Sequence, residues 1–291
     1  MLLTCALERF LEQLHADGRS PHTVGQYRRH VALFTRWLAQ DAKEEPSLAH
    51  VTHERRARFL GAPVARQRSD GEAKRATAVN ALRTSMRVFS SYLHRAGYLS
   101  QDPGRLIRRA ACSPPPPRGL SADEEARLLA SIAQDQSPRG RRDHALLRFL
   151  LRSGVRLSAA LGLHVEDLDL ALGTAEILTK GARRDRVLLS GELVEHLRAY
   201  LGDRVSGVVF PGPKGESLSR RHVLRMLKQR LKAAGVERSV CVHGLRHTFA
   251  LSLYQRTGDV LLVKEALGHR SISSTMVYAQ AGEDRLRRAL G

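Results

Sequence analysis

The sequence predicts a two-domain protein that is mainly α-helical, with a small β-hairpin or sheet in the second domain. Apolar residues recur every three to four positions through much of the first hundred residues, which is the spacing of amphipathic helices. Four consecutive prolines then stand in the segment 112–119, where they cannot continue a helix. Strand-like segments come only after the prolines. We therefore expect a helical domain over 1–111, a proline-rich linker over 112–119 and a second domain over 120–291.

Two helices are the clearest elements expected in the first domain. Ser20 followed by Pro21 is typical of a helix start, and an apolar stripe follows at helical spacing. A second helix is predicted from about residue 75 to residue 96. Both carry arginines off their apolar stripes, among them Arg28, Arg29, Arg83 and Arg87. Two basic amphipathic helices indicate a module that grips DNA, although a solvated charged face explains any one of these arginines alone.

The second domain is expected to combine helices with one hairpin. Acidic residues after Ser121 indicate a helix start, and residues 141–153 form an apolar helix that Gly154 ends. Residues 175–179 and 186–189 are predicted strands, and the turn between them is rich in basic residues. A basic helix is predicted over 219–234. Another begins at residue 243, and a last helical stretch follows residues 271–274.

The chain is strongly basic, which bounds its partners. It has 48 Lys and Arg against 29 Asp and Glu, a formal charge of +19. This charge predicts attraction to polyanions, DNA or RNA first and an anionic membrane surface second, although a generic arginine-rich composition gives the same total. No run approaches the roughly 18 apolar residues of a membrane span, and no signal-peptide pattern opens the sequence. The three cysteines form no evident pair, so we expect a cytoplasmic protein.

Residues suited to phosphate chemistry gather near the C-terminus. His243 and Arg246 share one face of a predicted helix, and His269 and Tyr278 follow. An arginine offers a planar fork of donors to phosphate oxygens, and a histidine can donate or accept a proton. Metal-dependent nucleases need grouped carboxylates. This cluster instead favours cleavage in which cations carry the phosphate charge and a side chain is the nucleophile.

Three further features bear on that chemistry. Arg156 follows the turn at Gly154, and Lys180 lies at the expected hairpin tip, where its ammonium can protonate a leaving oxygen. The plain alternative for Arg156 is an ordinary surface arginine, and that for Lys180 is a nonspecific DNA contact.

Tyr278 follows a Ser/Thr-rich turn, and a phenol with a pKa of about 10 needs positive surroundings to act as a nucleophile. His243 and His247 have metal-ligand spacing, but no further ligands complete a site, so we expect no metal and no cofactor.

Together these residues resemble the tyrosine recombinase family of phage integrases and Xer-type site-specific recombinases. The matching segments stand in chain order around the six residues Arg156, Lys180, His243, Arg246, His269 and Tyr278. The regions 118–123 and 20–28 also fit, so the resemblance spans nearly the whole chain. One position departs from it. The family usually has Glu three residues after the first arginine, where a carboxylate would orient the neighbouring basic residues, and this chain has Ala159.

The resemblance implies a reaction. Tyr278 would attack the scissile phosphate and form a 3′-phosphotyrosyl link, with His243 assisting removal of its proton. Lys180 would protonate the leaving 5′ oxygen. The phosphoryl charge would be stabilised by Arg156, Arg246, His243 and His269. A second exchange would resolve a Holliday junction, without metal or ATP.

The resemblance also implies an architecture and partners. The helical core-binding domain and the catalytic domain would form a clamp on a double-stranded recombination site. Four copies of the chain would assemble into a synaptic tetramer on that DNA, accessory DNA-bending proteins would be further partners, and no membrane would be involved. We predict DNA contacts from Arg28, Arg29, Arg83, Arg87, Arg183, Arg220, Arg221 and Arg225, with the helix 219–234 facing a groove.

Two other functions stay open on the sequence alone. One is DNA relaxation in the manner of a type IB topoisomerase, which uses similar chemistry without exchanging partners. The other is a DNA-binding accessory protein with a weakened active site, for which Ala159 is the one argument. The DNA target also stays open. So does the biological role, which can be integration and excision, dimer or cointegrate resolution, or inversion.

Overall fold

The computed structural model of the chain describes residues 1–112, 119–179, 183–269 and 271–279. The chain divides into two compact units, 1–113 and 114–291, each with its own hydrophobic core. Most of the predicted proline-rich linker and Lys180 lie outside the described residues. None of the helices in the described ranges is both long and apolar enough to span a membrane.

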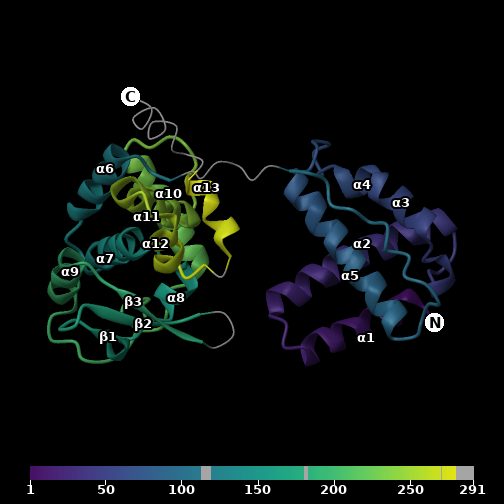
Figure 1. The fold of residues 1–291 in the computed structure, drawn as a ribbon, viewed down its shortest axis with the longest axis horizontal. Helices are drawn as coiled ribbons and strands as arrows, with labels where there is room; N and C mark the ends of the chain where they lie inside the picture. The colour runs from purple at the N-terminus through teal and green to yellow at the C-terminus, as the bar shows by residue number, and fades with distance from the viewer. Residues whose placement is uncertain (113–118, 180–182, 270, 280–291) are drawn as a thin grey trace. The chain divides into compact units, whose positions relative to one another are not determined.

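Over its described residues, 1–112, the first unit contains helices and no strand (Figure 1). The start predicted at Ser20 is confirmed, because its side chain accepts a hydrogen bond from the Thr23 amide at 3.3 Å. The second predicted helix is also confirmed, with bounds one residue inside the expected ones. The apolar stripes of these two helices fill the core of this unit. Its elements are α1 (Leu3–Ala16), α2 (Pro21–Ala42), a 3-10 turn (Leu48–His50), α3 (His53–Gly61), α4 (Pro63–Arg66) and α5 (Ala76–Arg95).

The second unit combines helices with a small antiparallel sheet, which lies at the lower end of this unit in Figure 1. Its first half contains α6 (Ala122–Ala133), α7 (Pro138–Ser153), α8 (Leu157–Leu161), a 3-10 turn (Val165–Asp167) and strands β1 (Leu168–Asp169), β2 (Thr174–Leu178) and β3 (Arg184–Leu188). Its second half contains α9 (Gly191–Leu201), α10 (Arg220–Ala233), α11 (Val242–Thr257), α12 (Val260–Ala266), a 3-10 turn (Ile272–Ser274) and α13 (Met276–Ala279). The predicted fold class, mainly α with a small sheet in two domains, is confirmed.

The sheet differs from the prediction in two details. Strand β3 begins at Arg184, two residues before the predicted start, because charged residues at its exposed positions made this part look like a turn. Strand β1 was not predicted, since two residues are too few to show a periodic pattern. The sheet order is β1-β2-β3, and Ile177 of β2 pairs with Asp185 of β3.

Gly154 follows helix α7 and packs against α11, the helix that carries His243 and Arg246. Its φ of +62° ends α7 in the left-handed region, as its position in the sequence predicts. A Cβ at this position would lie 2.3 Å from Cδ1 of Phe249, a residue of α11. Glycine is therefore required both by the turn and by the close approach of α11. This packing brings the end of α7 to the site described next.

Candidate active site

Arg246 is fixed at the centre of the site by two backbone carbonyls. Its Nη1 donates to the Gly154 carbonyl and its Nη2 to the Leu267 carbonyl, both at 2.6 Å. The residue is only 4% exposed, and burial together with the charge of Arg156 lowers its pKa to about 10. The end of α7, helix α11 and the end of α12 thus hold one guanidinium. Among the described residues its other N–H groups form no hydrogen bond, and Arg246 lines the pocket described next.

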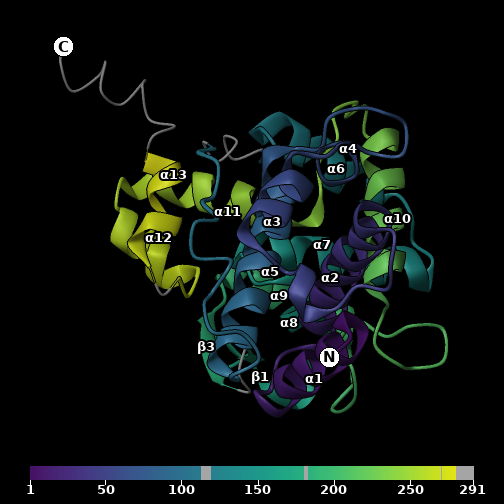
Figure 2. The same cartoon turned by 90° about the vertical axis from the view of Figure 1, so that its right-hand side faces the viewer.

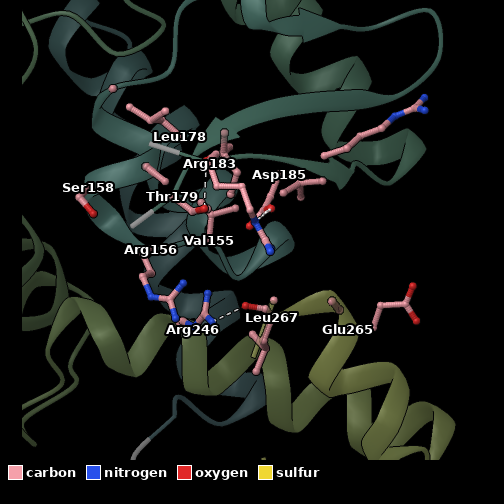
Figure 3. A pocket seen from close by; sticks show the side chains of 17 residues that line it. Val155, Arg156, Ser158, Leu178, Thr179, Arg183, Asp185, Arg246, Glu265 and Leu267 are labelled. Carbon is pink, nitrogen blue, oxygen red and sulfur yellow. Dashed lines mark hydrogen bonds and ion pairs between the residues drawn. The ribbon is translucent and has the colours of Figure 1, made fainter. Parts of the chain in front are cut away.

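Arg156 shares a pocket with Arg246 (Figure 3). It stands immediately before α8, as its sequence position predicts, and its side chain is exposed. The pocket has a volume of about 540 Å³ and is also lined by residues of β2, β3 and α12. Two guanidiniums facing one pocket repel each other unless an anion lies between them. The pocket is therefore suited to a phosphate group.

The phenol of Tyr278 contacts a histidine, but not the one that the sequence favoured. Its Oη lies 2.8 Å from Nδ1 of His247, and the two rings are 5.6 Å apart. His243, four residues earlier on α11, packs edge-on against His247 with ring centroids 4.8 Å apart. The two imidazoles and the phenol therefore form a chain of contacts that begins beside Arg246. The sequence signal for His247 was its helical spacing from His243, which we considered only for metal binding.

His269 is placed by the end of α12. Gly268 has a φ of +60°, and the His269 amide donates to the Lys264 carbonyl at 3.0 Å, which closes this helix end. The ring is oriented by Thr275, whose Oγ1 lies 3.0 Å from Nδ1. Figures 1 and 2 both show α12 and α13 against α11, the helix that carries His243 and Arg246.

The histidines of the site are held neutral by burial and by the two arginines. Burial, followed by nearby charge, lowers the pKa of both His247 and His269 to about 4. Burial, Arg246 and Arg156 also lower the pKa of His243. A neutral imidazole can accept a proton, whereas an imidazolium cannot. At neutral pH the histidine next to the phenol is thus in the accepting form.

Tyr278 is almost completely covered in this structure. It is 2% exposed, and burial raises the pKa of its phenol, an effect that the charge of Arg246 opposes. Tyr278 is thus covered in this structure, and any attack by its phenol on a phosphate would require the phenol to become exposed. Of the six predicted catalytic residues, the structure brings together five, Arg156, His243, Arg246, His269 and Tyr278. Lys180 lies outside the described residues.

The predicted DNA-contact residues divide into two groups. In the described part of the chain, Arg29, Arg87, Arg220, Arg221 and Arg225 are exposed and form no ion pair. The other three have partners: Arg28 pairs with Glu8 at 2.8 Å, Arg183 pairs with Asp185 at 2.6 Å, and Arg83 is partly buried and contacts Asn80 at 3.3 Å. Helix α10 buries most of its apolar residues and presents Arg220, Arg221, Arg225, Lys228 and Lys232 to solvent, whereas Arg230 is partly buried and pairs with Asp135.

The site can therefore perform one kind of chemistry well. Two arginines face a pocket that fits a phosphate, neutral imidazoles can move protons, and a phenol lies at the end of this network. Within the described ranges, no group of three His, Cys, Asp or Glu side chains is close enough to hold a metal ion. The fold and the site together define a class of phosphoryl-transfer proteins with a candidate tyrosine nucleophile.

Comparison with known families identifies this class. The model of the phage integrase family matches residues 118–285, more than half of the chain, and that of the phage integrase N-terminal SAM-like domain matches residues 7–97. The chain belongs to the phage integrase family and is a tyrosine-type site-specific recombinase by descent.

Individual relatives agree over nearly the full length. The tyrosine recombinase XerC of Chromobacterium violaceum is 30% identical over 277 residues, which cover 94% of this chain and 89% of that protein. The XerC protein of Xylella fastidiosa strain M23 is 33% identical over 276 residues, which cover 94% and 90%. Among solved structures, XerH recombinase bound to a palindromic difH substrate has a TM-score of 0.77 at 24% identity, covering 98% of this chain and 83% of that one. A lambda integrase tetramer bound to a Holliday junction has a TM-score of 0.72 at 18% identity, covering 93% and 78%. These two structures share the fold.

Proposed function

We propose that this recombinase cuts and rejoins double-stranded DNA through a covalent bond between Tyr278 and a 3′ phosphate. The observation that carries the proposal is the phenol of Tyr278 held 2.8 Å from a neutral histidine, His247, beside the arginine pair Arg156 and Arg246. The unit 1–111 acts as the core-DNA-binding domain, 112–119 as the linker and 120–291 as the catalytic domain.

The cleavage step uses groups from both ends of the catalytic domain. Oη of Tyr278 bonds to phosphorus, the bond from phosphorus to the 5′ oxygen breaks, and the phenol proton passes to an imidazole. The arginines and His269 stabilise the charge on the phosphoryl oxygens. The leaving 5′ oxygen takes a proton from Lys180, a role that rests on the family resemblance. No metal or ATP is consumed, because the phosphotyrosyl bond keeps the energy needed for rejoining.

Strand exchange follows from the same intermediate. A 5′ hydroxyl of a partner duplex attacks the phosphotyrosyl bond, and repetition of this exchange forms and resolves a Holliday junction. Four copies of the chain act together on two recombination sites, an arrangement supported by the lambda integrase tetramer on a Holliday junction, which shares this fold. The cysteines are unpaired, which fits a cytoplasmic setting. The involvement of accessory DNA-bending proteins stays a prediction.

A suicide substrate tests this function directly. DNA from the genomic neighbourhood, nicked close to the candidate cleavage site, should lose its short fragment after cleavage and trap the protein on the 3′ phosphate. We expect a covalent complex in EDTA without ATP, and peptide mapping should find the DNA on Tyr278. A complex on a 5′ phosphate, or on another residue, would contradict the proposal. Efficient relaxation of supercoiled plasmid that lacks a recombination site would favour the topoisomerase alternative.

The contact between His247 and Tyr278 predicts which histidine takes the phenol proton. The change His247→Ala should slow covalent-complex formation roughly 100-fold at pH 7, within the range of general-base effects. Raising the pH should restore the rate of this variant, because the phenolate fraction grows about tenfold per pH unit below the phenol pKa. The unmodified protein should show little dependence between pH 7 and 9, since His247 with its pKa of about 4 is already neutral.

Single-turnover cleavage across this pH range is the measurement. The variant His243→Ala is the comparison, because the sequence assigned proton removal to that residue. If His243→Ala shows the steep pH dependence and His247→Ala does not, the assignment to His247 fails.

Helix α10 is proposed to contact the DNA backbone or a groove. The change Arg221→Ala should weaken DNA binding at every salt concentration. It should also reduce the steepness of the plot of log binding constant against log salt concentration by about one, because one phosphate contact is lost. Fluorescence anisotropy with a labelled site between 50 and 300 mM salt would measure both. Arg198→Ala is the matched control, since Arg198 is exposed, is paired with Glu195 at 2.6 Å and is not among the predicted DNA contacts. An unchanged slope for Arg221→Ala would remove α10 from the interface.

A further inference from the structure

The pocket that contains Arg156 lacks a carboxylate at the position where the family usually has one. Ala159 lies one helical turn after Arg156, is 7% exposed and lines the same pocket. Its methyl group cannot accept a hydrogen bond from a guanidinium. Arg156 also faces the repulsion of Arg246 across this pocket. The arginine therefore needs an attractive partner from another element if it is to stay directed at the phosphate position.

Asp185 brings a carboxylate into this pocket from strand β3 (Figure 3). Its side chain is 26% exposed, and Oδ1 accepts a hydrogen bond from Nε of Arg183 at 2.6 Å. The hairpin holds it in place, because Asp185 pairs with Ile177 and the Thr179 amide donates to the Arg183 carbonyl at 2.7 Å. The carboxylate is thus carried by a hydrogen-bonded frame and faces a pocket that it shares with Arg156.

The charges in the pocket agree with this placement. The pKa of Asp185 is lowered by Arg183 first and also by Thr179 and Arg156, so the carboxylate is ionised and attracted to both cations. Glu265 is the second carboxylate among the described residues that line the pocket. In Figure 3 its side chain points away from Arg246, and it is exposed. Asp185 is therefore the carboxylate placed to act on Arg156.

We propose that Asp185 is the positioning residue for Arg156. From strand β3 it does what a glutamate at position 159 would do from α8. Its negative charge offsets the repulsion between the two guanidiniums and keeps Arg156 directed toward the phosphate. The inference rests on the proposed function, because it concerns the geometry of the same phosphate site.

The test compares variants at position 185 in single-turnover cleavage of the suicide substrate at saturating DNA. Asp185→Asn removes the charge, keeps the shape and should slow cleavage about 10- to 100-fold, the effect of a small misplacement of a reacting group. It should not weaken DNA binding, since the protein becomes more positive. Asp185→Glu restores the charge and should keep most of the rate. If Asp185→Asn cleaves at the unmodified rate, the proposal is overturned.

A second-site change separates positioning from a general structural role. Ala159→Glu combined with Asp185→Asn should recover most of the lost rate, because the carboxylate returns from α8. Ala159→Glu alone should change the rate little, so the two positions should be strongly non-additive. Thermal unfolding confirms that each variant is folded. A folded double variant that stays as slow as Asp185→Asn would contradict the proposal, and if it does not fold, the Asp185→Glu rate decides.

Arg183→Ala is the matched control for the neighbouring contact. Asp185 also binds Arg183, so a loss of rate can arise through that residue instead. We expect Arg183→Ala, at a residue predicted to contact DNA, to weaken DNA binding and to lower the rate at saturating DNA less than Asp185→Asn does. An equal loss of rate in Arg183→Ala and Asp185→Asn would assign the effect to Arg183. If the unmodified protein forms no covalent complex, the proposed function fails, which is distinct from any difference among these variants.

Discussion

Replacement of Tyr278 by phenylalanine should abolish the covalent complex with DNA. The change removes one oxygen atom, the only one on this side chain that can bond to phosphorus. We expect cleavage to fall by at least on the order of 10⁴-fold, as for other nucleophiles whose reactive atom is removed. Specific DNA binding should persist, because Tyr278 is buried and its phenol contacts His247 rather than the surface.

The measurement pairs denaturing gels of suicide-substrate reactions with a binding assay on the same DNA. Tyr200→Phe is the matched control. Its phenol is partly buried in the same unit and donates to the Val209 carbonyl at 2.9 Å, so this variant also loses one hydrogen bond. Tyr200→Phe should form the covalent complex at the normal rate. A complex that survives Tyr278→Phe would rule out this nucleophile and would point to another side chain.

Replacement of Arg246 by lysine should give the second largest effect. The guanidinium spans two carbonyls, Gly154 and Leu267, while its other N–H groups face the pocket. A lysine keeps the charge, but its ammonium group cannot hydrogen-bond both carbonyls and also offer a planar pair of donors to phosphate oxygens. We expect cleavage at saturating DNA to fall about 10²- to 10³-fold, the cost of removing one preorganised donor group. Loss of the buried clamps should also lower the unfolding temperature.

The same substitution at Arg221 provides the control, because that arginine is exposed on α10 and forms no ion pair in the described part of the chain. Arg221→Lys should keep both the cleavage rate at saturating DNA and the unfolding temperature. Stopped cleavage assays and thermal unfolding on both variants are sufficient. A normal cleavage rate for Arg246→Lys would mean that charge alone, rather than the fork of donors, is needed at this position.

Much of the fold was predictable because its signals are local. Ser20 before Pro21, the acidic residues after Ser121 and the glycine at position 154 each act on the next few residues, and the helix starts and ends lie where they predict. The two-residue strand β1 and the early start of β3 were missed, because pairing with a neighbouring strand decides them.

The sequence by itself determined which side chains are available for the chemistry, in an order typical of the family: Arg156, Lys180, His243, Arg246, His269 and Tyr278. Tertiary structure alone decided their partners. Arg246 donates hydrogen bonds to carbonyls that are 92 and 21 positions away in the sequence. His247 and Tyr278, which contact each other, are 31 positions apart. The approach of Asp185 to the pocket of Arg156 depends on the hairpin packing near α8. Spacing along the chain fixes which residues share a helix face, but contacts between distant segments arise only when their apolar faces are buried together.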